Sequence, residues 1–172
     1  PLSFPSGPFP HPAVHSVHAG NQPSDFSDCV LIPEGLHANA YHNRLVGKWQ
    51  GRDLAVQRGF HRCFGPNCQL KISYYHVVKD NQFYLNDKRW QFPNEGFYMT
   101  DAFNDYSDAF PKEAVKTGDP FFLYVAHIPP QWLLHAPVQL VENMPNELEK
   151  GWDEWRDIRA NRQKEMGLVA KN

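Results

Sequence analysis

A lysine and a glutamine flank a tryptophan in VGKWQG, the stretch at residues 46–51. A short apolar run ends at Gly47, so the pattern predicts a turn that follows a strand and carries Lys48. The ammonium group of a lysine there can bind an anion. The amide of Gln50 can donate and accept hydrogen bonds, but it cannot transfer a proton near neutral pH. The ordinary alternative for Lys48 is an exposed lysine packed beside the tryptophan.

Histidines near the start of the chain offer a second possibility for chemistry. His11, His15 and His18 are spaced so that a helix would carry all three imidazoles on one face, which would favour a metal site. Pro10 and Pro12 disfavour a regular helix through this segment. Solvated loop histidines are therefore the alternative to a metal site.

The cysteines leave three interpretations open. Cys29, Cys63 and Cys68 are the three cysteines of the chain, and the last two lie in CFGPNC. A Gly-Pro turn there could bring both sulfurs close enough for a disulfide. Free structural thiols and a metal site are the other interpretations, although no second Cys/His pair stands at zinc-finger spacing.

Composition places limits on the kind of protein. The chain has 172 residues, 41% of them hydrophobic and 14% aromatic, which is enough for one domain with a real core. The net charge of -2, without long runs of one sign, argues against nucleic acid or an acidic membrane surface as partner. No apolar run approaches the ~20 residues of a membrane helix. The sequence begins with Pro1 and shows no signal-peptide pattern, so we expect it to begin at a cut.

The turn at Lys48 must be positioned by the elements around it. Residues 1–28 are rich in proline and predict irregular loop. Residues 31–40 have apolar positions at helical spacing, and a short strand at 44–46 follows them. Two apolar stretches, 72–78 and 82–86, are separated by a polar turn and predict a hairpin.

An amphipathic helix is expected at residues 98–119. Thr100 is a plausible N-cap for it, and Gly118 is a good stop. Pro111 lies inside the pattern, where it removes a helix hydrogen bond and clashes with the preceding turn. We therefore expect a kink or an early end at this proline.

The last third of the chain sets the fold class. PFFLYVAHI, residues 120–128, is an unbroken apolar run that predicts a buried central strand of a parallel sheet. A final helix is expected at 152–168. The fold class is α/β, with an irregular segment at 1–28 and an α/β domain at 29–172.

Several segments resemble the type I, formylglycine-dependent sulfatases, or arylsulfatases, of the alkaline-phosphatase-like superfamily, and they occur in the family's order. VGKWQG resembles the family's V-G-K-W-H-L-G, and QRGFHRCFG its R-G-F-D-x-F-x-G. The remaining matches are SGPFPHP (6–12), GFYMTDAFNDYSDAF (96–110) with DPFFLYVAHIPPQWLLHAP (119–137), and GWDEWRDIRANRQKEMGLV (151–169). The resemblance implies part of a sulfatase sandwich, with a mostly parallel sheet flanked by helices.

The same resemblance implies hydrolysis of sulfate esters and roles for particular residues. Lys48 matches the family lysine that contacts sulfate oxygens and formylglycine. Gln50 stands at the family histidine that helps to eliminate sulfate, and Gln131 at the histidine that assists the leaving oxygen. His127 and His135 remain near the second of these positions. His135 is either structural or a substitute base.

Other parts of the family site are expected outside this sequence. The cysteine that becomes formylglycine would fall just before Pro1. The family holds calcium with two aspartates further upstream and an Asp-Asn pair that would lie beyond Asn172. No metal site is therefore expected from these residues alone, and no other cofactor. Family members are often secreted, periplasmic or lysosomal, and the sequence carries no address of its own.

Three hypotheses follow. The first is an incomplete and inactive segment of a sulfatase-family hydrolase whose substrate is a sulfate ester. The second is a non-catalytic relative that binds sulfated or other small anionic ligands through Lys48. The third is an interaction module that uses the Trp/Tyr-rich region 90–106.

Overall fold

The computed structural model describes residues 29–67, 75, 83–130, 134–144 and 149–170. The chain divides into two compact units, Pro1–Leu134 and His135–Asn172, and each is described by itself. Among the described residues, none of the helices combines the length and the apolar character that a membrane span requires.

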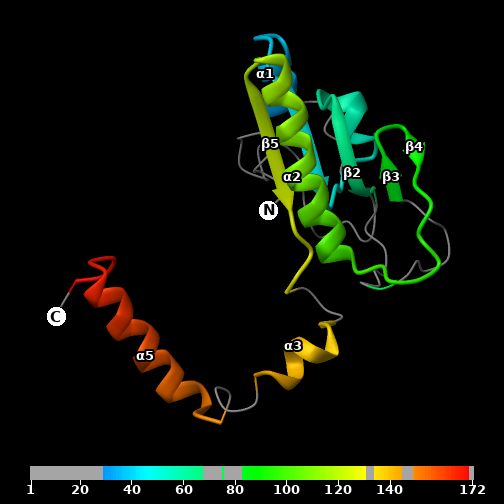
Figure 1. Cartoon of the computed structure of the whole chain (residues 1–172). Coiled ribbons are helices and arrows are strands. Elements are labelled where there is room, and N and C mark those ends of the chain that lie inside the picture. Colours follow the sequence, from blue (N-terminus) through cyan, green and yellow to red (C-terminus); the bar gives the residue numbers. More distant parts are fainter. Residues whose placement is uncertain (1–28, 68–74, 76–82, 131–133, 145–148, 171–172) are drawn as a thin grey trace. The chain divides into compact units, whose positions relative to one another are not determined.

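The first unit is built on a sheet, which Figure 1 shows with α2 lying along it. Within the described residues the sheet has five strands in the order β4-β3-β2-β1-β5. Strand β1 pairs in parallel with β2 and β5, whereas β3 pairs antiparallel with β2 and β4. The strands are β1 (His42–Gly47), β2 (Arg62–Pro66), β3 (Phe83–Leu85), β4 (Lys88–Arg89) and β5 (Phe121–Ala126). The predicted α/β class with a mostly parallel sheet is confirmed.

Helices cover both faces of this sheet. On one face, α2 (Met99–Thr117) packs against β1, β2 and β5. On the other face lie α1 (Ile32–His37) and the short 3-10 helix η1 (Ala55–Arg58). The predicted helix and strand within 31–46 are confirmed as α1 and β1.

Two apolar clusters fill the space between the sheet and these helices. Val46 and Phe64 are fully buried on the α2 side, whereas their chain neighbours Leu45 and Cys63 are buried on the α1 side. Successive residues of a strand point to opposite faces, so a strand covered on both faces is apolar throughout. This explains the unbroken apolar runs in the sequence.

The predicted position of the 120–128 strand is wrong. Strand β5 lies at the edge of the described sheet and pairs only with β1, and Phe121 and Val125 are 39% and 37% exposed. Leu123 packs on the α2-side cluster, while Phe122 and Tyr124 pack on the other cluster. Both faces are thus partly covered although the strand is not central. The predicted packing of the 98–116 helix across it is confirmed.

Details of helix α2 also differ from expectation. The helix continues through Pro111 to Thr117, because Phe110 and Ala114 on either side of the proline are buried and hold it on the sheet. Its N-cap is Tyr98 rather than Thr100, and the cap makes no side-chain hydrogen bond. Gly118 ends the helix in the left-handed conformation, as predicted.

The predicted hairpin is only partly described. The 82–86 stretch contains β3, which forms a tight turn with β4. Residues 72–74 and 76–78 lie outside the described residues, as do 1–28 with the three early histidines.

The second unit contains two described helices, α3 (Val138–Glu142) and α5 (Gly151–Glu165). The predicted helix at 152–168 is confirmed as α5. No residue of either helix is buried.

Candidate functional site

The residues after β1 join three parallel strands at their carboxyl ends. The backbone N–H of Lys48 donates to the carbonyl of Ala126, the last residue of β5, at 2.9 Å. The N–H of Trp49 donates to the carbonyl of Pro66, the last residue of β2, at 3.1 Å. In open α/β sheets, ligands bind at this carboxyl edge. Lys48 therefore stands where a ligand of the sheet would be expected.

Two glycines make this junction possible. Gly47 has φ +111°, and a Cβ there would lie 2.1 Å from the carbonyl oxygen of Ala126. Gly65 in β2 has φ +150°, and its Cβ would lie 2.1 Å from the carbonyl oxygen of Gly47. Only glycine tolerates both the conformation and the close approach. The glycine of the G-K-W motif therefore brings β1 close to β5 and β2.

The buried side chain of Trp49 holds the turn in place. Its side chain is 4% exposed, its Nε1–H donates to the carbonyl of Asp53 at 2.8 Å, and its ring meets Phe60 edge-on at 5.8 Å. A Cβ at Gly51 would lie 2.7 Å from the indole nitrogen, so the chain also folds tightly over the ring. The tryptophan is thus a structural element that fixes the backbone beside Lys48.

The residues predicted to form the site lie in different parts of the chain. Lys48 and Gln50 are both half-buried in the segment between β1 and η1. Gln131 lies outside the described residues, so its proximity to Lys48 stays a prediction. His127 is exposed directly after β5, with its ring centroid 6.1 Å from that of Phe103 in α2. His135 belongs to the second unit.

Sequence reasoning missed two polar residues near this edge. Asn67 follows β2 and forms a parallel bridge with Trp49. Thr100 lies in the first turn of α2, the helix whose Phe103 approaches His127. Asn67 Oδ1 and Thr100 Oγ1 are buried, and neither has a hydrogen-bond partner among the described residues. Buried oxygens of this kind normally have a partner, so they are candidates to meet a ligand or a further side chain.

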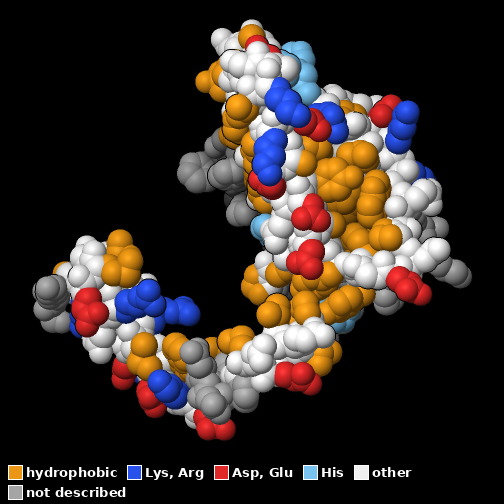
Figure 2. Space-filling model, in the orientation of Figure 1, with side chains coloured by type: hydrophobic (Ala, Val, Ile, Leu, Met, Phe, Trp, Pro, Cys, Tyr) orange, Lys and Arg blue, Asp and Glu red, His pale blue; other side chains and the backbone are white. Residues whose placement is uncertain are grey.

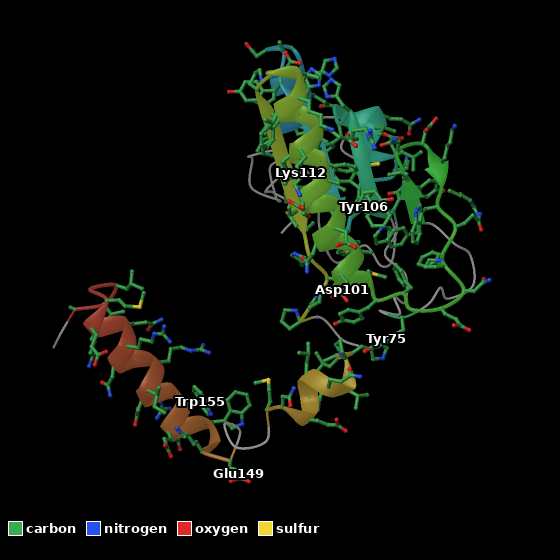
Figure 3. The ribbon with its side chains drawn as sticks, in the orientation of Figure 1. Tyr75, Asp101, Tyr106, Lys112, Glu149 and Trp155 are labelled. Atoms are coloured by element: carbon green, nitrogen blue, oxygen red, sulfur yellow. The ribbon has the colours of Figure 1, made fainter. Side chains whose placement is uncertain are left out.

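The amino end of α2 adds a positive dipole. Figure 3 shows Asp101 at the beginning of this helix, with Tyr106 and Lys112 further along it. The free N–H groups of a first turn favour a nearby anion. The exposed carboxylate of Asp101 opposes part of this effect.

Cys63 is not a nucleophile at neutral pH. Its side chain is 5% exposed, and its Sγ donates to the carbonyl of Asn86 at 3.3 Å. Burial raises the pKa of the Cys63 thiol to about 11, so the thiolate is scarce at pH 7. Cys63 is a free thiol, which agrees with the free-thiol interpretation and not with a disulfide in CFGPNC, and Cys68 lies outside the described residues.

Metal ligands do not gather in the part of the chain that the structure describes. No three His, Cys, Asp or Glu side chains there could hold a metal ion together. The described residues thus offer no set of carboxylates that would fit calcium.

The aromatic region 90–106 belongs largely to the core. Trp90 packs edge-on against Phe64 at 5.2 Å, and Phe97 and Phe103 are buried. Figure 2 shows apolar side chains gathered beside α2, where half-buried residues such as Trp90 and Tyr106 border the cluster. This packing explains the aromatic composition without a partner protein.

The fold is similar to that of solved sulfatase structures. No protein-family model matches the chain. A crystal structure of Ps i-CgsB, a carrageenan sulfatase, matches with a TM-score of 0.66 at 23% identity. The structure of Ps i-CgsB in complex with k-i-k-neocarrahexaose matches with a TM-score of 0.70 at 24% identity. Each match covers 84% of this chain and 37% of that chain. The chain therefore has a partial sulfatase-like α/β fold.

Proposed function

We propose that this chain is the sulfate-recognising part of a sulfatase-family hydrolase. The observation that carries the proposal is the position of Lys48, on a turn that joins β1, β2 and β5 at their carboxyl ends. The sulfatase-like fold supports the same assignment. The chain spans only 37% of the length of the sulfatase it matches, so the activity of a whole enzyme is part of the proposal.

Sulfate recognition at this edge needs positive charge and hydrogen-bond donors. The ammonium group of Lys48 supplies a compact charge for the sulfate oxygens. The first turn of α2 supplies a favourable dipole, and the hydroxyl of Thr100 supplies a further donor. The buried anchor Trp49 holds the lysine backbone in place, which lowers the cost of ordering the site.

Proton transfer is the step that these residues do not support. Gln50 and Gln131 stand where the resemblance predicts histidines, and an amide cannot act as a general acid or base at pH 7. None of the three cysteines stands in the C-x-P-S-R motif, whose cysteine becomes formylglycine in the family that the sequence resembles.

Gln50 also favours a second candidate function, a non-catalytic protein that binds sulfated or other small anionic ligands. Its amide can still hydrogen-bond to a sulfate oxygen beside Lys48. Both candidates share the same binding site and differ in turnover. Nucleic acid and membrane surfaces are not proposed as partners, in keeping with the balanced charge.

Titration of the purified chain with a sulfated carrageenan oligosaccharide at low ionic strength tests the binding site. The Lys48→Ala variant should bind about 10- to 100-fold more weakly, because a hydrogen bond to a charged group is worth about 1.5–3 kcal/mol. Lys88→Ala is the matched control, since Lys88 is an exposed lysine on β4. Desulfated oligosaccharide should bind neither variant measurably. Equal affinities for the two lysine variants would refute the proposed site.

A further inference from the structure

Three histidines stack at the amino end of the sheet, away from the Lys48 turn. His61 lies between the other two rings, at 4.6 Å from His37 with a 15° angle and at 5.1 Å from His42 with a 9° angle. His37 is the last residue of α1, His42 the first residue of β1, and His61 the residue before β2. The stack therefore joins the ends of three elements.

The central ring is held in its neutral form by a backbone hydrogen bond. The N–H of Asn43 donates to His61 Nδ1 at 3.0 Å, and the N–H of His61 donates to the carbonyl of Asn43 at 2.8 Å. Because Nδ1 accepts this bond, the neutral ring carries its proton on Nε2. A proton added to Nδ1 would face the N–H of Asn43 and break the bond.

The charged groups around the stack act in both directions. Partial burial and then the neighbouring His37, His42 and Arg44 lower the pKa of His61, and together they outweigh the opposing effect of a hydrogen bond with the backbone of Asn43. On the outer side, the carboxylate of Asp119 lies 3.3 Å from His42 Nε2.

Two further acids lie on the elements that pack nearby, and both have partners of their own. On α1, the carboxylate of Glu34 is bound by Arg58. On α2, the carboxylate of Glu113 pairs with Arg62 at 3.0 Å. Neither acid is therefore available to compensate a charge on His61.

Several elements meet at Asn43, the residue whose backbone N–H binds His61. The side-chain Nδ2 of Asn43 donates to the carbonyl of Pro33 in α1 at 2.6 Å and to that of Gly59 after η1 at 2.9 Å. Leu31, immediately before α1, is fully buried in the cluster beneath. Opening of the joint at Asn43 would loosen α1 and uncover that cluster.

We propose that the stack of His37, His61 and His42 is an acid-sensitive clamp that fastens α1 and η1 to the amino end of the sheet. Protonation of His61 breaks its bond from Asn43 and places a positive charge between two imidazoles and Arg44. The clamp then opens, and the Leu31 side of the core becomes accessible. Sulfate binding at the opposite end of β1 is not required for this device.

The direction of the pH dependence follows from linkage. The pKa of His61 is lower in the folded protein than the ordinary value of about 6.5. A lowered pKa means that the folded state disfavours the proton. The stabilisation is complete above about pH 6.5 and is lost as the pH falls through the lower folded value.

NMR on the complete 172-residue chain between pH 7.5 and pH 5 tests the clamp. The ring signals of His61 should titrate below the ordinary histidine value. Amide-exchange protection of Asn43, corrected for intrinsic rates, should fall by up to about tenfold per pH unit in the acid range. His61→Asn places an amide oxygen where Nδ1 stands, so its Asn43 protection should not depend on pH. His135→Asn, in the second unit, should keep the wild-type profile.

A second variant keeps the proposal testable if His61→Asn fails to fold. The double substitution His37→Gln with His42→Gln removes both flanking rings, so the pKa of His61 should rise towards its ordinary value. The acid loss of Asn43 protection should then shrink. Three outcomes would overturn the clamp. The first is constant Asn43 protection in the wild type, and the second is an unchanged acid loss of that protection in either variant. The third is titration of wild-type His61 at or above the ordinary histidine pKa.

Discussion

Individual residues at the two ends of β1 have different structural roles. At the carboxyl end, Gly47 lets the chain approach β5, and Trp49 fixes the turn that carries Lys48. At the amino end, Asn43 ties together α1, η1 and β2. The Gly-Lys-Trp turn could be predicted from sequence because turn chemistry is local. The role of Asn43 could not, since its partners lie 10, 16 and 18 residues away.

Substitution of Gly47 by alanine should destabilise the protein by about 2–4 kcal/mol, through the strained φ and the clash with the carbonyl of Ala126. Gly35→Ala is the control, because nothing lies within 4 Å of a Cβ there. In helix α1 it should be stabilising by up to about 1 kcal/mol. Urea unfolding measures both. A Gly47→Ala variant as stable as the wild type would mean that the junction is looser than described.

Asn43→Ala should cost about 2–4 kcal/mol, because it leaves the buried carbonyl of Pro33 and the partly buried carbonyl of Gly59 without their donor. Asn39→Ala removes a similar side-chain bond, from Asn39 Nδ2 to the carbonyl of Gly35, but at an exposed position. It should change stability by no more than about 0.5 kcal/mol. Equal effects in a denaturation series would contradict the assigned role of burial.

Glu34 should produce an acid transition at lower pH than the histidine stack. Burial alone would raise the pKa of Glu34, but hydrogen bonds from Arg58 and the N–H of Leu31, together with the charge of Arg58, lower it. The stabilisation is therefore present above the ordinary value of about 4.3 and is lost as the pH falls through the lower folded value. Stability measured from pH 6 to pH 3 should show this loss in the wild type. Glu34→Gln should remove it, and persistence of the loss in that variant would assign it to another group.

Among the elements, α2 shows how packing overrides a local rule. A proline inside a helix removes one hydrogen bond and disturbs the preceding turn, which predicts a break at Pro111. The helix nevertheless continues, because Phe103, Phe110 and Ala114 are all buried against the sheet. The sequence contains this apolar stripe. The sequence does not show how strongly this stripe packs on the sheet, because that depends on β1, β2 and β5.

Strand β5 shows a different limit of prediction. Its apolar residues correctly predict contacts on both faces, since Leu123 meets one cluster and Tyr124 the other. The order of strands in a sheet is set by pairings that leave no local signal. Hence the sequence could not distinguish a central strand from the edge strand that the described sheet has.

Pro111→Ala should restore a backbone donor to the carbonyl of Ser107 and stabilise the protein by about 1–3 kcal/mol. Val115→Ala is the control on the exposed side of the same helix, since Val115 is 70% exposed. It should contribute no more than about 0.7 kcal/mol, through helix propensity alone. Thermal unfolding followed by circular dichroism compares the two. A lower midpoint for Pro111→Ala would show that the proline ring itself is part of the packing.

At the scale of the whole molecule, the two units differ in how they use apolar residues. The first unit buries its large side chains in two clusters. In the second unit, Trp152 is 93% exposed. Trp155 is labelled in Figure 3, and its ring lies 5.8 Å from the ammonium group of Lys150. The helix could be predicted from its periodicity, but the stripe that predicted it covers no core in the described residues. Apolar surface of this kind is typical of an interface.

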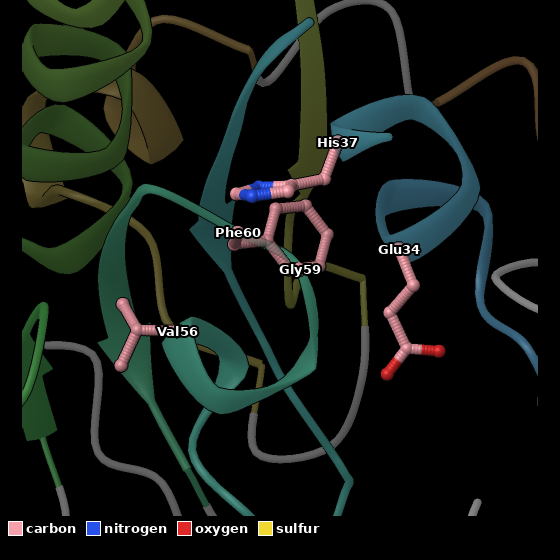
Figure 4. A pocket seen from close by; sticks show the side chains of 5 residues that line it. All are labelled: Glu34, His37, Val56, Gly59 and Phe60. Carbon is pink, nitrogen blue, oxygen red and sulfur yellow. The ribbon is translucent and has the colours of Figure 1, made fainter. Parts of the chain in front are cut away.

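One small pocket of the first unit, of about 280 Å³, illustrates why a cavity alone does not define a site. Figure 4 shows it between α1 and η1, where Glu34, His37 and Phe60 line it. The carboxylate of Glu34 already accepts hydrogen bonds from Arg58 and Leu31. The pocket therefore offers little polar capacity to a ligand. At the carboxyl edge, by contrast, the buried oxygens of Asn67 and Thr100 have no hydrogen-bond partner among the described residues.

Purified chain should not hydrolyse a chromogenic aryl sulfate measurably, with or without calcium. Gln50 and Gln131 cannot transfer protons, each such group is typically worth about 10²–10⁴-fold, and the only described cysteine in the core, Cys63, has a pKa of about 11. Gln50→His with Gln131→His should also fail in this chain, because none of its three cysteines stands in the C-x-P-S-R from which the formylglycine nucleophile is made.

In a longer protein that carries C-x-P-S-R, the same two substitutions should raise turnover, while the Lys48→Ala variant should lower it. The comparison separates the two candidate functions, because a binding protein without a nucleophile gains nothing from added histidines. Lys88→Ala controls for the loss of a positive charge elsewhere on the surface. Calcium-dependent cleavage by residues 1–172 alone, above the level of a Lys48→Ala variant, would contradict the assignment of these glutamines.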